Sequence, residues 1–242
     1  MSGLRAALAE PHTKAPYVRR LFHTIADRYD LITRLLSFGA DRRWKLRLAA
    51  LADLRSGTTA LDLACGTGDI ACELARRGAR VFGLDLTHRM LQLAQQKNEG
   101  PRPVRFVTGD MMALPFADAS FDLVTTGYGI RNVPLIEPAL AEIRRVLRPG
   151  GLLLSLDFDR PANRLVRAVY LGYLTIVGSA LGWVLHRDPD TYRYIPESIR
   201  RYPGSAGVSA MLARGGFSDA RVVPLLGGLM AINVARRASE RR

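Results

Sequence analysis

LDLACGTGD, at residues 61–69, is the stretch that decides the fold. An apolar run is followed by Gly66-Thr67-Gly68 and a helix-like segment, which is the pattern of a strand, a tight turn and a helix. Gly66 and Gly68 have no Cβ, so the backbone can pass close to a ligand that faces the free N–H groups of the helix start. Asp85, in GLDL, ends the next predicted strand, where an acid can hydrogen-bond a ribose diol. The sequence therefore predicts half of a site for a nucleoside-like cofactor.

Two cofactors fit this half-site, NAD and S-adenosylmethionine. The spacing Gly66-x-Gly68-x-x-Ala71, with Asp85 19 residues after Gly66, also satisfies the loose dinucleotide fingerprint. Asp62 favours S-adenosylmethionine, because its carboxylate, inside the first strand, can meet the ammonium group of a methionine moiety.

Three later segments favour S-adenosylmethionine further. GDMMALPF, at residues 109–116, places Asp110 after a third strand, where an adenine amino group can be recognised. ASFDLVTTGYGIRNV, at 119–133, supplies a fourth strand and a polar loop, and RVLRPGG, at 145–151, closes a helix before a fifth strand.

The alternation of strands and helices predicts an α/β fold with a parallel sheet and helices on both faces. Strands are expected near residues 59–64, 80–84, 104–108, 121–126 and 152–157, and helices near 69–77, 87–97 and 135–147. The region of about 221–235 is expected to supply two more strands. We predict effectively one domain, made of a helical N-terminal cap at 1–55 and a methyltransferase domain at 56–242, with a helical insertion at about 158–203.

Composition is that of an ordinary globular protein, with 48% hydrophobic and 24% charged residues in a chain of 242. The two cysteines, Cys65 and Cys72, flank the glycine turn without zinc spacing, so we interpret them as buried thiols in a reducing cytoplasm. No metal site is expected. No signal peptide is expected either, because MSGLRAALAEPHTK lacks a sustained apolar region.

The formal net charge of +13 is uneven along the chain. Residues 12–47 hold nine lysines and arginines against three aspartates, and the tail ARRASERR adds four arginines against one glutamate. A solvated surface is one interpretation, and attraction to an anionic membrane surface is another. Nucleic acid is not expected, because basic and aromatic residues are not interleaved. The localisation expected is cytoplasmic, with peripheral contact to the inner face of the membrane left open.

One long stretch is apolar enough to raise the question of a membrane span. Residues 168–185 hold no charge and barely reach the length that crosses a bilayer. A span here would split the predicted domain, so we expect a buried helix with an apolar face, part of which lines a channel for a hydrophobic substrate.

The chain resembles the UbiE/MenG-type quinone C-methyltransferases from about residue 20 to about 235. Its generic motifs are those of a class I methyltransferase, with a Rossmann-like, seven-stranded, mostly parallel sheet whose last pair of strands is antiparallel. Three further stretches are specific to the family: IADRYDLITRLLSFGADRRWKLRLA at 25–49, GYGIRNV at 127–133 and DPDTYRYIPESIRRYP at 188–203. The resemblance implies ring methylation of a lipophilic prenylated quinol, with demethylmenaquinol as the first expectation and a methoxy-polyprenyl-benzoquinol as the second. A homodimer is left open.

The resemblance also implies cofactor contacts at individual positions. They fall on residues in the glycine turn and after the second, third and fourth strands: Thr67, Asp85, Asp110, Met111 and Gly127. Some members of the family carry serine where Gly127 stands, so this chain can offer only the backbone there.

Arg131 and Asn132 are the first catalytic candidates, because they follow the fourth strand at the edge where such sheets bind ligands. Arginine stays protonated, so Arg131 is expected to stabilise a phenolate or to orient a water rather than to act as a base. A structural alternative is a loop arginine that pairs with Asp110 or Asp122, and Asn132 could simply shape the turn.

Tyrosines and histidines outside the sheet are further candidates. Tyr29, in the N-terminal signature, is expected to close over the cofactor or the ring, or else to be a core aromatic. Tyr192 and Tyr194 are expected to edge the quinol cavity or to pack on the sheet. His23 and His186 are weaker candidates for a proton carrier.

Two rival functions remain open at this point. An RNA or protein methyltransferase would carry an Asn/Asp-Pro-Pro-aromatic loop after the fourth strand, where this chain has GYGIRNV. A regulator that binds the cofactor without chemistry is disfavoured by the intact turn, Asp85 and Arg131.

Overall fold

A seven-stranded sheet with the strand order β3-β2-β1-β4-β5-β7-β6 forms the centre of the computed structural model, which describes residues 3–99 and 103–239. Its strands are β1 (Thr59–Leu63), β2 (Arg80–Asp85), β3 (Arg105–Thr108), β4 (Phe121–Gly127), β5 (Leu147–Phe158), β6 (Phe217–Leu225) and β7 (Met230–Arg237). β1 to β5 pair in parallel, and β7 is antiparallel to both β5 and β6. The predicted sheet and its antiparallel last pair are confirmed, although β5 begins at Leu147 rather than near 152.

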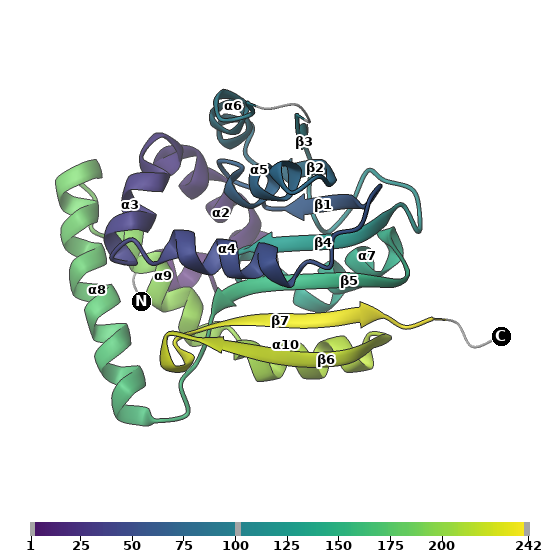
Figure 1. Ribbon diagram of the computed structural model, residues 1–242. Coiled ribbons are helices and arrows are strands. Elements are labelled where there is room, and N and C mark those ends of the chain that lie inside the picture. The colour runs from purple at the N-terminus through teal and green to yellow at the C-terminus, as the bar shows by residue number, and fades with distance from the viewer. Residues whose placement is uncertain (1–2, 100–102, 240–242) are drawn as a thin grey trace.

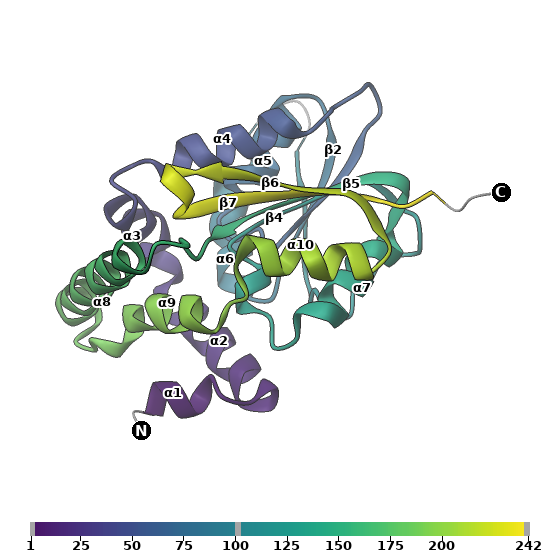
Figure 2. The same ribbon diagram turned by 90° about the horizontal axis from the view of Figure 1, so that it is seen from below.

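Helices cover both faces of the sheet. In chain order they are α1 (Gly3–Ala7), α2 (Pro11–Ile25), α3 (Tyr29–Leu36), α4 (Asp41–Leu51), α5 (Asp69–Arg76), α6 (His88–Gln96), α7 (Ile136–Val146), α8 (Arg164–His186), α9 (Asp190–Arg201) and α10 (Gly204–Arg214), with short 3-10 turns η1 (Ala26–Arg28), η2 (Ile130–Asn132) and η3 (Leu226–Gly228). One buried cluster joins α4 and α5 to the sheet, and a second joins α7 and α10 to its other face. Figure 2 shows the sheet between these two pairs of helices.

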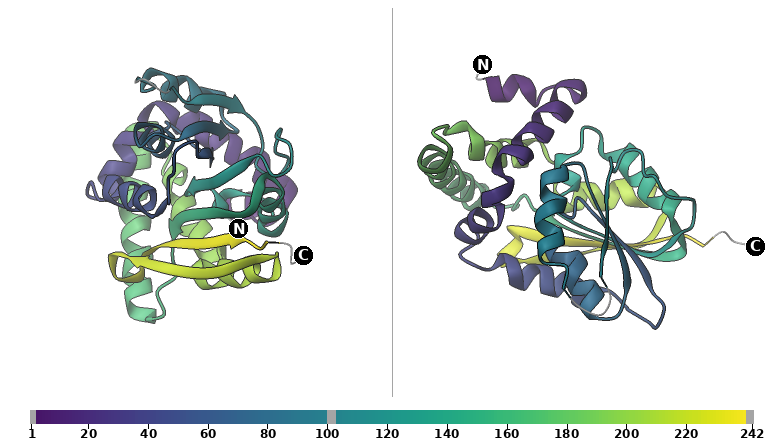
Figure 3. Two further views of the ribbon diagram at one scale, coloured as in Figure 1. Left: turned by 45° about the vertical axis from the view of Figure 1, so that its right-hand side comes forward. Right: turned by 90° about the horizontal axis from the view of Figure 1, so that it is seen from above.

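α6 packs against β2 and β3, whereas α2, α3, α8 and α9 gather beyond the carboxyl ends of the parallel strands, at the left in Figure 1. A third buried cluster links α1, α2 and α3 to Tyr192 and Tyr194 of α9. The two halves of this helical layer come from opposite ends of the sequence, as the purple and green segments in Figure 3 show. The strand order reverses between β1 and β4, and ligands bind at such a switch point. The layer therefore lies over the edge where a ligand is expected, while the division at residue 55 and the insertion at about 158–203 stay predictions.

The prediction that residues 168–185 form a buried helix is wrong. α8 is the outermost helix in Figure 1, and only 17% of its most apolar window is buried. Its buried residues are Leu174, Gly178 and Gly182, all on the side that packs against α9. Within the described residues it is the one helix long and apolar enough to cross a bilayer, a test that also admits helices of other kinds.

Two smaller predictions can be settled or placed. Cys65 and Cys72 are free and buried, as predicted. Glu240, Arg241 and Arg242 of the predicted basic tail lie outside the described residues, whereas Arg236 and Arg237 are in β7.

Candidate active site

The glycine turn after β1 has the backbone geometry that the sequence predicts. Gly66 and Gly68 have positive φ of 54° and 82°, where other residues are strained. The carboxylate of Asp85 accepts hydrogen bonds from the backbone N–H groups of Gly66 at 2.9 Å and Thr87 at 2.8 Å. Burial raises the pKa of Asp85. Asp85 thus fixes the turn, and each of its oxygens keeps a lone pair for a ligand.

Asp62 has one carboxylate oxygen without a partner among the described residues. Its Oδ1 accepts a hydrogen bond from Thr125 Oγ1 at 2.7 Å, whereas Oδ2 is buried and unpaired. Burial raises the pKa of Asp62 to about 7. A buried, unpaired acceptor is costly unless a ligand supplies the missing donor. An ammonium group is the ligand that would satisfy this oxygen.

Two adjoining cavities run along this edge of the sheet and share Tyr29, Ala64, Gly66, Gly127 and Tyr128. The larger, of about 110 Å³, is also lined by three predicted cofactor residues: Asp85, Asp110 and Met111. The smaller, of about 20 Å³, is also lined by Lys45, Asp62, Thr67 and Asp69. Together they form the cofactor cleft, which offers an ammonium acceptor at one end and a ribose acceptor at the other. These residues fit S-adenosylmethionine.

Gly68 alone of the predicted cofactor residues does not line the cleft. It faces α6 and β3 instead, where an added Cβ would lie 3.1 Å from Ala94 Cβ and 3.2 Å from the ring of Phe106. Gly127 does line the cleft, and a Cβ there would meet Ile70 Cδ1 at 2.8 Å. A serine at Gly127 would therefore require Ile70 to move.

A charged network ties the N-terminal helices to the cofactor cleft. Lys45 contacts Asp41 at 2.6 Å and Asp69 at 3.0 Å, and Lys97 contacts Asp69 at 2.9 Å and Asp30 at 2.6 Å. Although burial alone would lower it, the pKa of Lys45 is raised by the two carboxylates. The network thereby connects α3 and α4 to the first turn of α5.

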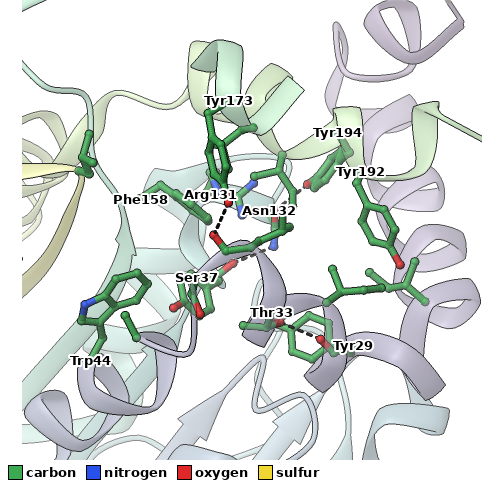
Figure 4. A pocket seen from close by; sticks show the side chains of 18 of the residues that line it. Tyr29, Thr33, Ser37, Trp44, Arg131, Asn132, Phe158, Tyr173, Tyr192 and Tyr194 are labelled. Carbon is green, nitrogen blue, oxygen red and sulfur yellow. Dashed lines mark hydrogen bonds between the residues drawn. The ribbon is translucent and has the colours of Figure 1, made fainter. Parts of the chain in front are cut away.

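A third cavity, of about 530 Å³, lies beside the cofactor cleft (Figure 4). We call it the substrate cavity. Its walls are mostly apolar and aromatic and come from α2, α3, α4, η2, α8 and α9. Four residues line both this cavity and the cofactor cleft: Phe22, Tyr29, Tyr128 and Asn132. At this junction, an atom of a ligand in the cofactor cleft could meet an atom of a ligand in the substrate cavity.

Arg131 lines the substrate cavity and is only 5% exposed. Its Nε donates to Asp157 Oδ1 at 3.2 Å, and its Nη1 donates to Ser198 Oγ. Its guanidinium lies 5.0 Å from the ring centre of Phe158 and 5.9 Å from that of Tyr194. No described residue accepts a hydrogen bond from Nη2. A rigidly held cation with one free donor edge is therefore placed at the cavity wall.

The ion-pair partners suggested for Arg131 from the sequence are wrong. Asp110 forms an isolated bridge with Ala113, and Asp122 pairs with Arg148 and the backbone of Thr59. Asp157, at the end of β5, takes their place because β5 lies next to β4 in the sheet.

Asn132 and Tyr194 are hydrogen-bonded to each other in the wall of the substrate cavity, and Tyr192 stands near them in the same wall (Figure 4). Asn132 Nδ2 donates to the backbone oxygen of Tyr128 at 2.7 Å, and its Oδ1 accepts from Tyr194 Oη at 2.7 Å. Tyr192 Oη lies 2.8 Å from His186 Nε2. Both tyrosines are buried and line the substrate cavity, so they do more than pack on the sheet.

Tyr29 lies at the junction of the cavities, and burial raises its pKa to about 12. It therefore keeps its proton at neutral pH. The two histidine candidates are elsewhere. His23 is exposed on α2, and neither His23 nor His186 lines the substrate cavity.

Sequence reasoning missed several residues of the site. Tyr128 lines all three cavities with a strained positive φ of 63°, and its hydroxyl donates to Asp41 at 2.5 Å. Burial and Asp41 raise the pKa of Tyr128 far above its usual value. Asp157 could have been found by the rule that identified Asp85, because both acids end a strand at the carboxyl edge. Tyr170 and Tyr173 carried no signal beyond an apolar run.

Comparison with known proteins decides the family. Residues 10–237 match the model of the ubiE/COQ5 methyltransferase family. The chain belongs to the ubiE/COQ5 methyltransferase family. It is therefore an S-adenosylmethionine-dependent methyltransferase, and the cofactor predicted from the sequence is confirmed.

Relatives support this membership over nearly the whole chain. A demethylmenaquinone methyltransferase from Thermus thermophilus is 44% identical over 220 residues, which cover 90% of this chain and 100% of the relative. A ubiquinone/menaquinone biosynthesis C-methyltransferase UbiE from Rubrivivax gelatinosus is 39% identical over 92% of this chain and 87% of the relative. A demethylmenaquinone methyltransferase from Staphylococcus aureus is 32% identical over 96% of this chain and 98% of the relative.

Solved structures agree on the fold. An S-adenosylmethionine-dependent methyltransferase from Thermotoga maritima superposes with a TM-score of 0.68 at 20% identity and covers 91% of this chain and 99% of that chain. An S-adenosylmethionine-dependent methyltransferase from Methanococcus maripaludis gives a TM-score of 0.62 at 19% identity, covering 91% of this chain and 95% of that chain.

Proposed function

We propose that the protein transfers a methyl group from S-adenosylmethionine to a ring carbon of a prenylated quinol, as the C-methylation step of quinone biosynthesis. The observation that carries the proposal is the meeting of an acid-containing cofactor cleft and an aromatic-lined cavity at Tyr29, Tyr128 and Asn132, beside Arg131. The names of the relatives point to the same chemistry.

Individual roles in the cofactor cleft follow from the free acceptors and donors. We assign Asp62 Oδ2 to the ammonium group and Asp85 to the ribose hydroxyls. Asp110 and Met111 would face the adenine, and the backbone at Gly66 and Gly127 would flank the sulfonium. Thr67 donates to Asp30 at 2.6 Å, so it acts through the network that holds α3 against the turn.

When bound, S-adenosylmethionine supplies an electrophilic methyl group on a positively charged sulfur. Arg131 would stabilise the phenolate oxygen of the quinol through Nη2, which raises electron density on the carbon ortho to it. Asp157, whose pKa burial raises despite the neighbouring Arg131, holds the guanidinium in place and is a positioning residue. Asn132 and Tyr194 orient the ring, and the aromatic wall excludes water.

The step balances without a further reactant. The methyl group leaves sulfur, which becomes a neutral thioether, and bonds to the ring carbon. That carbon then loses its hydrogen as a proton and the ring becomes aromatic again. The phenolic oxygen gives up its proton to form the phenolate and takes one back at the end, so one proton in total is released to the solvent.

Demethylmenaquinol is the substrate we propose first, and a methoxy-polyprenyl-benzoquinol is the second. The assay incubates the protein with methyl-labelled cofactor and each reduced quinone, with total RNA and unfolded protein as alternative acceptors. We expect label on the quinol ring, identified by product mass. Label on RNA or protein, or cofactor binding without transfer to any acceptor, would favour one of the rival functions.

The proposed cellular setting is the cytoplasmic side of a membrane, because a prenylated substrate resides there. A homodimer stays a prediction, which sedimentation of the protein over a range of concentrations tests.

A further inference from the structure

The outer side of α8 carries a row of large apolar side chains that face solvent. Leu165, Val169, Ile176 and Trp183 follow one another at intervals of 4, 7 and 7 residues. At about 100° per residue they lie within about 40° of one another and span about 27 Å of helix. Their exposed fractions run from 55% to 73%. We call this row the outer stripe.

The inner side of α8 is already occupied. Gly178 and Gly182 allow α9 and the chain before it to approach, and a Cβ on Gly178 would lie 3.3 Å from Tyr192 Cβ. Tyr170 and Tyr173 line the substrate cavity. A helix that is apolar on all sides is ordinarily buried in a core or in lipid. The outer stripe of α8 has no such cover within the part of the chain that the structure describes.

The mouth of the substrate cavity opens next to α8. Phe38 and Leu226 line the cavity and are nevertheless 84% and 53% exposed. The Phe38 ring stacks on Tyr173 at 5.8 Å between ring centres, and α3 lies beside α8 in Figure 2. A prenyl chain too long for the cavity would leave past Phe38 and Leu226, at this exposed part of the lining.

The segment that carries the outer stripe has an excess of positive charge, with Asp159 and Asp188 just beyond its two ends. From residue 160 to residue 187 the chain holds no aspartate or glutamate and four arginines: Arg160, Arg164, Arg167 and Arg187. Arg164 and Arg167 stand at one end of α8, and Arg187 at the other, where its guanidinium lies 5.9 Å from the ring centre of Trp183. Tryptophan and arginine beside an apolar stripe suit the interface of an anionic bilayer.

We propose that the outer stripe is the surface that docks on a bilayer containing anionic lipid. α8 lies in the plane of the interface, and the cavity mouth opens toward the acyl chains. The inference rests on the quinol function proposed above, because the prenyl tail is what needs this route. A second copy seated on the stripe would crowd the mouth, and a spanning α8 would carry α9 and the cavity walls into hydrocarbon.

Vesicle binding by paired variants tests the proposal. Ile176→Glu places a charge in the outer stripe, and Leu135→Glu places the same charge on an exposed apolar residue before α7. With vesicles of equal parts phosphatidylcholine and phosphatidylglycerol, we expect Ile176→Glu to weaken binding at least about tenfold. Leu135→Glu should bind like the wild type. Arg164→Glu should weaken binding at low salt more than Arg221→Glu, which makes the same charge change on β6.

A fluorescence reporter locates the surface independently. The chain has two tryptophans, so Trp44→Phe leaves Trp183 as the reporter. Its emission should shift to the blue on vesicles and be quenched by brominated lipid. A reporter created by Leu135→Trp, with Trp44→Phe and Trp183→Phe, should show neither change.

Vesicle binding is measured without quinol, so it is independent of the methylation assay. Docking would be overturned if the wild type ignores the vesicles at low salt, or if both glutamate variants bind equally well. It would also be overturned if only detergent releases the protein, or if the stripe forms a dimer that Ile176→Glu breaks while vesicles do not bind. A wild-type protein that binds the vesicles but methylates no quinol would refute the proposed reaction alone.

Discussion

The cofactor cleft and the substrate cavity meet at Tyr29 and Tyr128, yet they are built in opposite ways. The cleft contains buried acids, and two of them, Asp62 and Asp85, belong to adjacent strands of the sheet. The substrate cavity is aromatic, and its walls come from helices at both ends of the chain. The comparison teaches that chain order alone can place the residues of the cleft, whereas only packing can place those of the cavity. It also implies that binding and catalysis can be disturbed separately.

Arg131→Ala should give the largest effect. It removes the cation beside the quinol oxygen and should cut turnover by about a hundredfold or more, with affinity for the cofactor near that of the wild type. Arg131→Lys should recover only part of the rate, because lysine lacks the planar fork. Steady-state kinetics measures the turnover of both variants, and calorimetry measures their affinity for the cofactor.

Folding is the control for that variant. Losing Arg131 leaves Asp157 buried without its partner, which costs about 3–5 kcal/mol of stability in comparable pairs. Adding Asp157→Asn removes the stranded charge and should restore stability without restoring turnover. Recovery of turnover in the double variant would mean that Arg131 has only a structural role.

Asp85→Ala should give the next largest effect, on the cofactor side of the comparison. The ribose hydroxyls lose a charged acceptor that contributes about 1.5–3 kcal/mol, so affinity for S-adenosylmethionine should fall about tenfold to a hundredfold. Asp53→Ala, an exposed carboxylate before β1, is the matched control. Unchanged affinity in a folded Asp85→Ala protein would remove Asp85 from the site.

The pH dependence of cofactor affinity should reveal Asp62. The pKa of this buried acid is raised to about 7, so the carboxyl is protonated below that pH, whereas an ammonium ligand needs the ionised form. Affinity should therefore rise with pH toward about 7, by up to tenfold per unit, and then level off. In Asp62→Asn, any pH dependence that comes from the ligand itself should remain, but the pH dependence that comes from the Asp62 carboxyl should be lost. Parallel profiles for the two proteins would argue against the ammonium contact.

Lys14 should give the smallest effect, on the cap that joins the two regions. Its Nζ donates to the backbone oxygens of Arg131 and Val133 at 3.1 and 2.5 Å, and burial with the nearby Arg131 lowers its pKa to about 8. Lys14→Met should speed hydrogen exchange of α2 about fivefold, which corresponds to about 1 kcal/mol. Arg20→Met on the same helix should not. Equal exchange in both variants would mean that Lys14 does not hold α2 in place.

The sequence predicted the sheet, because its residues follow a local pattern of strand, turn and helix, and all the predicted cofactor residues except Gly68 line the cleft. Sequence reasoning failed for the partner of Arg131, because it considered Asp110 and Asp122 and not the acid at the carboxyl end of the next strand. Asp110 follows β3, at the far edge of the sheet, and Asp122 lies near the start of β4, whereas Asp157 ends the neighbouring β5. It also failed to predict that α8 is largely exposed, because an apolar helix has the same sequence pattern in a core and on a surface.

A double-mutant cycle on Asp85→Ala and Arg131→Ala tests most directly that the two regions act separately. Cofactor affinity and turnover at saturating cofactor are measured in all four proteins. We predict that the Asp85 variant approaches wild-type turnover once it is saturated with cofactor, and that the Arg131 variant binds cofactor normally but stays slow. For each of the two measured quantities, the change in the double variant should equal the sum of the changes in the single variants within about 0.5 kcal/mol. A coupling above about 1 kcal/mol, or a loss of cofactor affinity in Arg131→Ala as large as in Asp85→Ala, would contradict the account.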